Sequence, residues 1–140
     1  NITYHQFSVG VKRMIIEVTL SCPKKVTLLL VHLSLGKRTR TKQIQELITF
    51  IKKIKNPVIL MGDFNTLSGP LELKQLLTQT HLCDTYRLQD YSPEFTYPSR
   101  HPDKRLDYVL VSPEIKVNHY DVLKYSFSDH RPLLVDFTVR

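Results

Sequence analysis

Two apolar runs joined by an amphipathic stretch constrain the fold of this chain more than any other feature. Residues 26–33, VTLLLVHL, are apolar on both strand faces until their polar end, and residues 58–61, VILM, form a second continuous apolar run. Such runs are typical of strands that are covered on both faces, inside an α/β sheet. Between residues 41 and 55, isoleucine and leucine recur at helical spacing opposite lysines, so we expect a helix that packs on the sheet and ends before Pro57.

The rest of the chain adds further strands and one short helix. Alternation over residues 14–20 predicts a strand with one strongly buried face, which would carry Met14, Ile16, Val18 and Leu20. A second helix is expected near Pro70, with its inward face formed by Leu73, Leu76 and Leu77. Three further strands are predicted around residues 105–111, 120–125 and 132–139.

Composition sets the outer limits. A chain of 140 residues is enough for one compact domain, which we expect to span residues 1–140. The formal net charge of +7 favours contact with phosphates or an acidic surface. Cys22 and Cys83 lack the paired spacing of a zinc site and are expected to be free thiols in a reducing compartment. No apolar stretch reaches the roughly 18 residues that a membrane span needs, and no signal peptide opens the chain, so we expect a cytoplasmic protein.

A carboxylate and a carboxamide follow the second apolar run. Gly62 would let the backbone turn where the strand emerges, which places Asp63 and Asn65 at the rim of the sheet. Taken alone, this stretch is equally compatible with an ordinary turn, because Asp and Asn favour turns through side-chain to backbone hydrogen bonds.

Other strands also carry polar residues at one end. These residues are His32, then Arg105 with Asp107, then Asp129 with His130. Each has an ordinary explanation when it is taken alone: a core histidine, a solvated Arg–Asp pair and a solvated loop. Four polar strand ends in one short chain, however, favour a common site.

Four segments resemble, in this order, the motifs of the endonuclease/exonuclease/phosphatase superfamily, which includes abasic-site endonucleases, pancreatic-type deoxyribonucleases, sphingomyelinases and inositol-phosphate phosphatases. The segments are VHLSLG (31–36), GDFN (62–65), FTYPSRHPDKRLDYVLVS (95–112) and SDHRPLLVDF (128–137). The resemblance covers almost the whole chain. It implies an α/β fold in which two mixed, mostly antiparallel sheets stack face to face with helices outside. This chain would supply the later part of that deoxyribonuclease-like domain and lack its N-terminal part.

The resemblance implies catalytic roles for His32, Asp63, Asn65, Asp107 and His130. His32 would donate hydrogen bonds to the scissile phosphate or the leaving group, and Asp63 would orient or deprotonate the attacking water. Asn65 would hold a non-bridging oxygen as an uncharged donor. Asp107 would fix the tautomer of His130 and favour its imidazolium form, which would stabilise charge on the phosphoryl oxygens.

Three further residues are implied around these groups. Asp129 resembles a ligand of Mg²⁺, with Mn²⁺ as an alternative, because such ions prefer carboxylate oxygen. Thr96 matches a position at the rim of the active site, and Arg105 is expected to bind substrate phosphate.

The implied activity is that of a magnesium-dependent phosphoesterase, a nuclease or phosphatase, which hydrolyses a phosphodiester or phosphomonoester by in-line attack of water. In the family, the metal-binding Glu lies on a strand that precedes the segment corresponding to residue 1 onward of this chain. The alternative is therefore a catalytically impaired fragment or binding module that needs a missing N-terminal segment or a partner. A metal-free structural domain would leave the polar strand ends unexplained. The substrate stays open between nucleic acid, nucleotide, lipid head group and inositol phosphate.

The implied missing part also predicts an uncovered sheet face. That face would bear some of Met14, Ile16, Val18, Leu29 and Val31. Exposed apolar area beyond a few hundred Å² marks an interface or an aggregation liability, so we expect either self-association that covers this face or a marginally stable chain.

Overall fold

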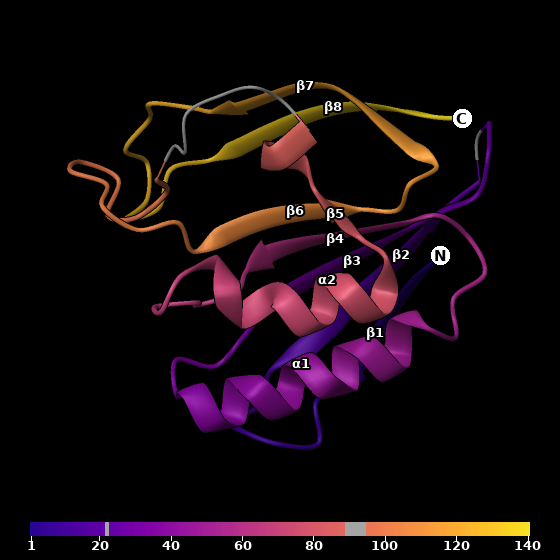
Figure 1. Cartoon of the computed structure of the whole chain (residues 1–140), viewed down its shortest axis with the longest axis horizontal. Helices are drawn as coiled ribbons and strands as arrows, with labels where there is room; N and C mark the ends of the chain where they lie inside the picture. The colour runs from indigo at the N-terminus through magenta and orange to yellow at the C-terminus, as the bar shows by residue number, and fades with distance from the viewer. Residues whose placement is uncertain (22, 89–94) are drawn as a thin grey trace.

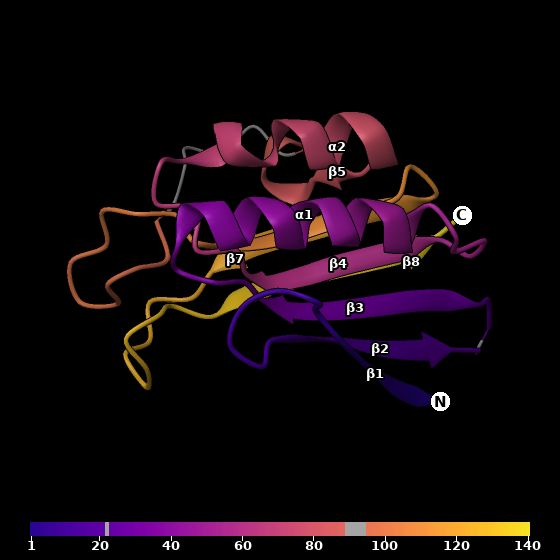
Figure 2. The same cartoon turned by 90° about the horizontal axis from the view of Figure 1, so that it is seen from below.

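The computed structural model describes residues 1–21, 23–88 and 95–140. Two helices cover one face of a six-stranded sheet, and a two-stranded sheet lies over part of the other face (Figures 1 and 2). The elements are β1 (Ile2–Gln6), β2 (Met14–Leu20), β3 (Val26–His32), α1 (Lys37–Ile51), β4 (Val58–Asp63), the 3₁₀ turn η1 (Pro70–Leu73), α2 (Lys74–Thr80), β5 (Cys83–Asp84), the 3₁₀ turn η2 (Thr85–Leu88), β6 (Asp107–Val111), β7 (Ile115–Val122) and β8 (Leu133–Val139). The α/β class and the two-sheet architecture agree with the sequence prediction.

The order of the large sheet, β1-β2-β3-β4-β6-β5, places the two apolar runs at its centre. Strands β3 and β4 are parallel and are joined by α1, and their register pairs His32 with Asp63. Strand β6 runs antiparallel to β4 and pairs its first residue, Asp107, with Asp63. Three polar strand termini therefore lie side by side at one end of the central strands. We call this the cleft end of the sheet, because the cleft described below lies there.

Helix α1 begins and ends about one turn earlier than the sequence pattern predicted. Its buried apolar face includes Ile44, Leu47 and Ile51, as expected from the helical spacing. The early start is explained by Arg40, which is buried beneath the loop after β3 and is only 1% exposed. At the other end, Ile54 N donates to Ile51 O, so the chain tightens into a 3₁₀ turn before Pro57.

The prediction for the buried face of β2 was wrong. Ile15 is the buried residue of this strand, whereas Met14 and Leu20 are 42% and 43% exposed. Leu29 and Val31, expected on the uncovered face, pack instead in the core cluster beneath the helices. The physical reason is that the helices cover the face that bears Ile15, together with its cross-strand partner Val31. The more apolar face of β2, which bears Met14 and Leu20, points away from the helices.

The second sheet covers only part of the large-sheet face opposite the helices, at the end of the strands away from the cleft end. A small apolar cluster joins it to β3, β4 and β6 and consists of Val26, Ile59, Val111 and Ile115. Beyond it, apolar side chains of the central strands are left partly or largely exposed, with Leu30 at 43%. The large sheet thus has an uncovered apolar face, as predicted. Met14 and Ile16 lie on it as expected, beside Leu30, whereas Leu29 and Val31 do not.

The other predicted elements are present with shifted boundaries, whereas β1 and β5 were not predicted. The strand expected at 120–125 is β7, which begins at Ile115, and the strand expected at 105–111 begins at Asp107. The short helix near Pro70 is present as η1 followed by α2. Cys83 is a free, half-buried thiol, and Cys22 lies outside the described residues. Within the described residues, no helix has the length and apolar character that a membrane crossing requires.

Candidate active site

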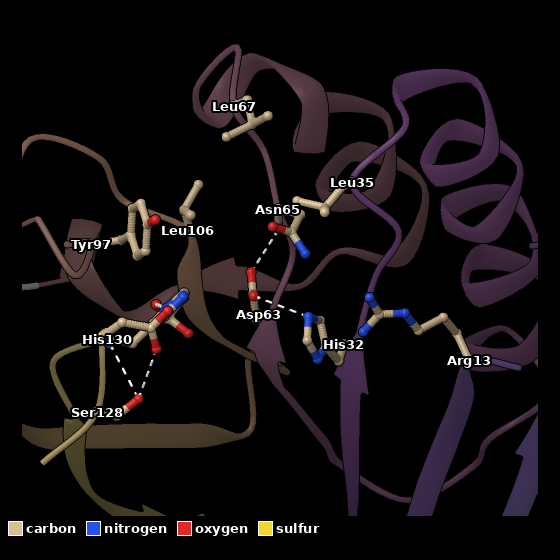
Figure 3. A pocket seen from close by; sticks show the side chains of 12 residues that line it. Arg13, His32, Leu35, Asp63, Asn65, Leu67, Tyr97, Leu106, Ser128 and His130 are labelled. Carbon is tan, nitrogen blue, oxygen red and sulfur yellow. Dashed lines mark hydrogen bonds and ion pairs between the residues drawn. The ribbon is translucent and has the colours of Figure 1, made fainter. Parts of the chain in front are cut away.

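An open cleft of about 550 Å³ lies at the cleft end of the sheet (Figure 3). Its walls bring together six of the residues that the sequence analysis selected. They are His32, Asp63, Asn65, Asp107, Asp129 and His130. They come from four separate segments, so the tertiary fold rather than sequence proximity assembles them.

Asp63 lies at the centre of this group. Its Oδ1 accepts a hydrogen bond of 2.8 Å from the backbone N–H of Asn65, and its Oδ2 lies 3.3 Å from Nε2 of His32. Burial raises the pKa of Asp63 above its ordinary value; the neighbouring Asp107 adds to this effect, while the Asn65 hydrogen bond and the two histidines oppose it. A carboxylate with a raised pKa is a better proton acceptor than an ordinary aspartate.

Asn65 is held in an unusual backbone conformation. Its φ is 50°, a left-handed value that asparagine tolerates better than most residues. The side chain is almost fully buried, and its Nδ2 donates a 2.8 Å hydrogen bond to the carbonyl of Leu33. Asn65 therefore ties the loop after β4 to the end of β3, which fixes the spacing between Asp63 and His32. Its second amide hydrogen is the one that remains for a ligand in the cleft.

His130 and Asp107 form the pair that the resemblance implied. Nδ1 of His130 lies 2.7 Å from Oδ2 of Asp107, and the ring packs 4.9 Å from that of Tyr97. Partial burial alone would lower the pKa of His130, but the hydrogen bond and charge of Asp107, together with the charges of Asp63 and Asp129, raise it above its ordinary value. These contacts thus stabilise the imidazolium form of His130 in the cleft relative to that of an ordinary histidine.

Asp129 is exposed at the cleft, where its Oδ1 accepts a 3.0 Å hydrogen bond from the hydroxyl of Ser128. Among the described residues, no group of three or more His, Cys, Asp or Glu side chains is close enough together to hold a metal ion. These residues by themselves therefore do not form a complete metal site. Asp129 is an exposed carboxylate that a hydrated Mg²⁺ could share, since Mg²⁺ keeps several of its waters.

Thr96 does not contact the cleft, because it is fully buried. Its Oγ1 lies 3.1 Å from the backbone N of Leu106 and 3.3 Å from that of Asp107, and both N–H groups donate to it. Thr96 therefore holds the first residues of β6 in place, and with them the carboxylate of Asp107.

Arg105 is not brought to the cleft either. Its guanidinium forms a bidentate ion pair with Asp84, at 2.6 and 2.7 Å, and stacks against the rings of Tyr86 and Tyr108. Its side chain is only 9% exposed. The predicted strand extended back to residue 105, whereas β6 begins at Asp107. Arg105 therefore lies outside the strand alternation, and its side chain can point elsewhere. The structure assigns Arg105 to the interior rather than to substrate phosphate.

Arg13 is a cleft residue that the sequence analysis missed. It precedes β2, lines the cleft, and extends its guanidinium toward His32 (Figure 3). A cation directly before an apolar strand was the available signal, but its relation to His32 depends on the pairing of β2 with β3. Arg13 adds positive charge opposite His130.

Solved structures and a curated relative resemble this chain. A UPF0294 protein of Yersinia pseudotuberculosis serotype O:1b (strain IP 31758) is 31% identical over 107 residues, which are 76% of this chain and 39% of that protein. A functionally unknown conserved protein from Enterococcus faecalis V583 has a TM-score of 0.82 at 21% identity and covers 100% of this chain and 66% of that chain. The human Nocturnin catalytic domain with bound sulfate anion has a TM-score of 0.77 at 26% identity and covers 100% of this chain and 59% of that chain.

The chain thus spans less than half of the curated relative and about two thirds of the Enterococcus structure. The structural likeness shows the fold, and the family is shown by the sequence itself, because residues 3–130 match the family model described as Endonuclease/Exonuclease/phosphatase. The chain belongs to the endonuclease/exonuclease/phosphatase family.

Proposed function

We propose that this chain carries the water-activating and phosphate-binding groups of a hydrolase that cleaves a phosphodiester or phosphomonoester by in-line attack of water. One observation carries the proposal: the carboxylate of Asp63 and the imidazole of His130 share one cleft, and the pKa of each is raised. A base and a cation placed on one ligand-sized cleft suit proton abstraction from water beside a phosphoryl group.

Asp63 accepts the proton of the attacking water. The hydrogen bond from the Asn65 N–H holds its Oδ1, so the other oxygen is the one that faces His32 and the cleft. Because burial raises the pKa of Asp63, the carboxylate binds a proton more readily than an exposed aspartate does. A base positioned in this way contributes roughly 10² to 10⁴ to a rate.

The positive groups of the cleft receive the phosphate. His130, held by Asp107, donates from Nε2 to a non-bridging oxygen, and Arg13 and His32 approach from the other side (Figure 3). Charge that grows on these oxygens during attack meets donors that are already in place, so little reorganisation is needed. The sulfate anion of the human Nocturnin structure supports an anion-binding role for this fold.

We further propose that the reaction depends on Mg²⁺ or Mn²⁺ and that Asp129 contributes to holding the ion. When bound, the ion would supply positive charge to the phosphate. Since the described residues lack a complete ligand set, further ligands would come from the substrate phosphate, from water, or from chain that this sequence does not include. The alternative function is that of a binding module that acquires activity only with such additional chain or with a partner.

The uncovered face of the large sheet bears on this alternative. Met14 and Leu30 expose apolar area on it, and grooves along it reach the cleft at His32 and Asp63. We propose that further chain or self-association covers this face in the working protein. Nucleic acid is one phosphodiester that the cleft suits by charge, and the other phosphoesters considered above stay open.

The test is hydrolysis of chromogenic phosphodiesters and phosphomonoesters by the full-length protein, with Mg²⁺ and with chelator. His130→Gln is expected to lower turnover at least about a hundredfold, because it removes the cation at the phosphate. Asp103→Asn is the matched control, since Asp103 is an exposed acid that pairs with Lys104 outside the cleft. Equal turnover of His130→Gln and the wild type would contradict the proposed role of His130 in the site. Turnover that a chelator does not change would contradict the proposed dependence on Mg²⁺ or Mn²⁺.

A further inference from the structure

Large apolar side chains are exposed on the loops that surround the cleft. They are Leu35, Leu67, Tyr125 and Phe127. Leu35 lines the cleft and is 65% exposed. Phe127 is 89% exposed and directly precedes Ser128, which lines the cleft. Single exposed apolar residues are normal on a protein surface, but a group gathered around one site calls for an explanation.

These side chains stand on opposite sides of the cleft. Leu35 and Leu67 line the wall formed by the loops after β3 and β4, across from Ser128 and His130 (Figure 3). Tyr125 and Phe127 belong to the loop between β7 and β8 that carries these two residues, and their rings stack with centroids 5.4 Å apart. In Figures 1 and 2 the loops leave the same end of the molecule.

Positive side chains accompany the apolar ones at this end. Arg13 lies in the cleft, Lys37 and Arg38 open α1 after Leu35 and Gly36, and Lys124 precedes Tyr125. The first turn of α1 holds no acidic residue, although acids stabilise a helix N-terminus. Cations at this position weaken the helix in isolation, so their placement favours an anionic partner over stability of the helix itself.

We propose that the cleft end is a docking surface for an anionic phospholipid membrane, with the apolar side chains entering the boundary between head groups and acyl chains. Apolar side chains flanked by Lys and Arg are the composition that binds such an interface. With the function proposed above, on which this consequence rests, the hydrolysed phosphoester is then one presented at the membrane surface. Docking in this orientation points the mouth of the cleft at the lipid head groups.

The leucines favour a membrane over a nucleic acid. Single-stranded nucleic acid is bound by aromatic rings on which bases stack, together with cations along the backbone. Leu35 and Leu67 have no ring and offer a base little, whereas they suit acyl chains. Tyr125 and Phe127 stack on each other, which makes them one compact apolar projection rather than two separate platforms.

Co-sedimentation with vesicles tests the proposal without an activity assay. The full-length protein is mixed with vesicles of phosphatidylcholine alone and with vesicles that contain phosphatidylserine. Binding is expected to the anionic vesicles and to weaken with salt. The double variants Leu35→Ser/Leu67→Ser and Tyr125→Ser/Phe127→Ser should each lower the partition coefficient at least about tenfold, since each removes two large apolar side chains from the interface.

Two controls lie at the opposite end of the sheet. Leu20→Ser removes an exposed apolar side chain there, and Lys53→Gln/Lys55→Gln removes two exposed positive charges. Both should bind vesicles as the wild type does, and circular dichroism should show all variants folded. No vesicle binding by the wild type, or equal losses in the controls, would overturn the proposal.

A binding assay with single-stranded nucleic acid tests the alternative occupant of this surface. If single-stranded nucleic acid binds and the vesicles do not, and the same loop variants abolish that binding, the surface belongs to nucleic acid and the proposal is wrong. Hydrolysis of a small soluble phosphoester should be unchanged in the Tyr125→Ser/Phe127→Ser variant. A protein that binds vesicles as expected but hydrolyses nothing would retain the docking surface and reject the proposed function, so the two failures are distinguishable.

Discussion

Replacing Gly62 by alanine tests how the sheet positions the groups of the cleft. The φ of Gly62 is 135°, a conformation that residues with a Cβ rarely adopt. A Cβ built there would overlap the carbonyl oxygen of Val31 and lie 2.9 Å from its carbonyl carbon. The obstructing atoms are backbone, so no side-chain rotation relieves the overlap, and β3 and β4 must separate.

Two costs add up in this substitution. Holding a residue with a Cβ in such a conformation costs about 1–3 kcal/mol. Separating the parallel pair costs more, since Gly62 lies beside Val31 in the register, one position before His32 and Asp63. We expect the free energy of unfolding to fall by at least about 3 kcal/mol, in line with the large values seen for backbone strain and overpacking. A displacement of about 1 Å at the paired strand ends would also lower turnover about a hundredfold.

The assay is urea unfolding of the full-length protein, followed by circular dichroism, with turnover measured on the fraction that remains folded. Gly36→Ala is the matched control, because Gly36 has a φ of −72° and a Cβ there would meet nothing within 4 Å. The free energy of unfolding of Gly36→Ala should fall by less than about 1 kcal/mol, the effect of a weaker N-cap residue. If Gly62→Ala unfolds within about 1 kcal/mol of the wild type, the close approach of β3 and β4 is not what fixes the site.

Four further predictions follow from the same contacts. Asp63→Asn should lower turnover at saturating Mg²⁺ by at least about a hundredfold with the fold retained; a near-wild-type rate would remove its role as base. Asp107→Asn should lower the pKa of His130, so the alkaline limb of the pH–rate profile moves to lower pH; in the wild type, the stability linked to His130 protonation is complete below its unfolded pKa and disappears as pH rises through the higher folded value. Arg105→Leu should lower the free energy of unfolding by about 3–5 kcal/mol, because Asp84 is left charged and unpaired in the interior, whereas unchanged stability would mean that the pair is dispensable. In sedimentation and Mg²⁺ titration, the isolated 140 residues should self-associate or be marginally stable and bind Mg²⁺ weakly; a stable monomer with an ordinary Mg²⁺-dependent rate would show the opposite.

The sequence predicted the secondary structure correctly where hydrophobic periodicity within one segment determines it. The apolar runs at 26–33 and 58–61 became the central parallel strands, and the helical spacing of isoleucine and leucine placed α1 on the sheet. Boundaries were less well predicted because they depend on partners outside the element. Arg40 extends α1 toward its N-terminus through an ion pair with Glu72, which is 32 residues away in the chain.

The face of β2 could not be assigned from the sequence for a related reason. Alternation tells which residues share a face, but it does not tell which face a helix covers. The burial of Ile15 rather than Met14 depends on where α1 crosses the sheet. Arg105 shows the same limit, since its nearness to Asp107 in sequence suggested a shared site, and only the position of β5 offered it Asp84.

The sequence by itself determined the chemical identity of the candidate site, because the polar residues that end its apolar strands are local features that are visible without a fold. The tertiary structure decided which of them act together. The parallel register of β3 and β4 and the antiparallel register of β6 bring His32, Asp63 and Asp107 to one edge, and the loop before β8 then delivers His130 to Asp107. Strand register depends on contacts between residues that are far apart in the chain, and these contacts form only when helices, strands and loops pack together.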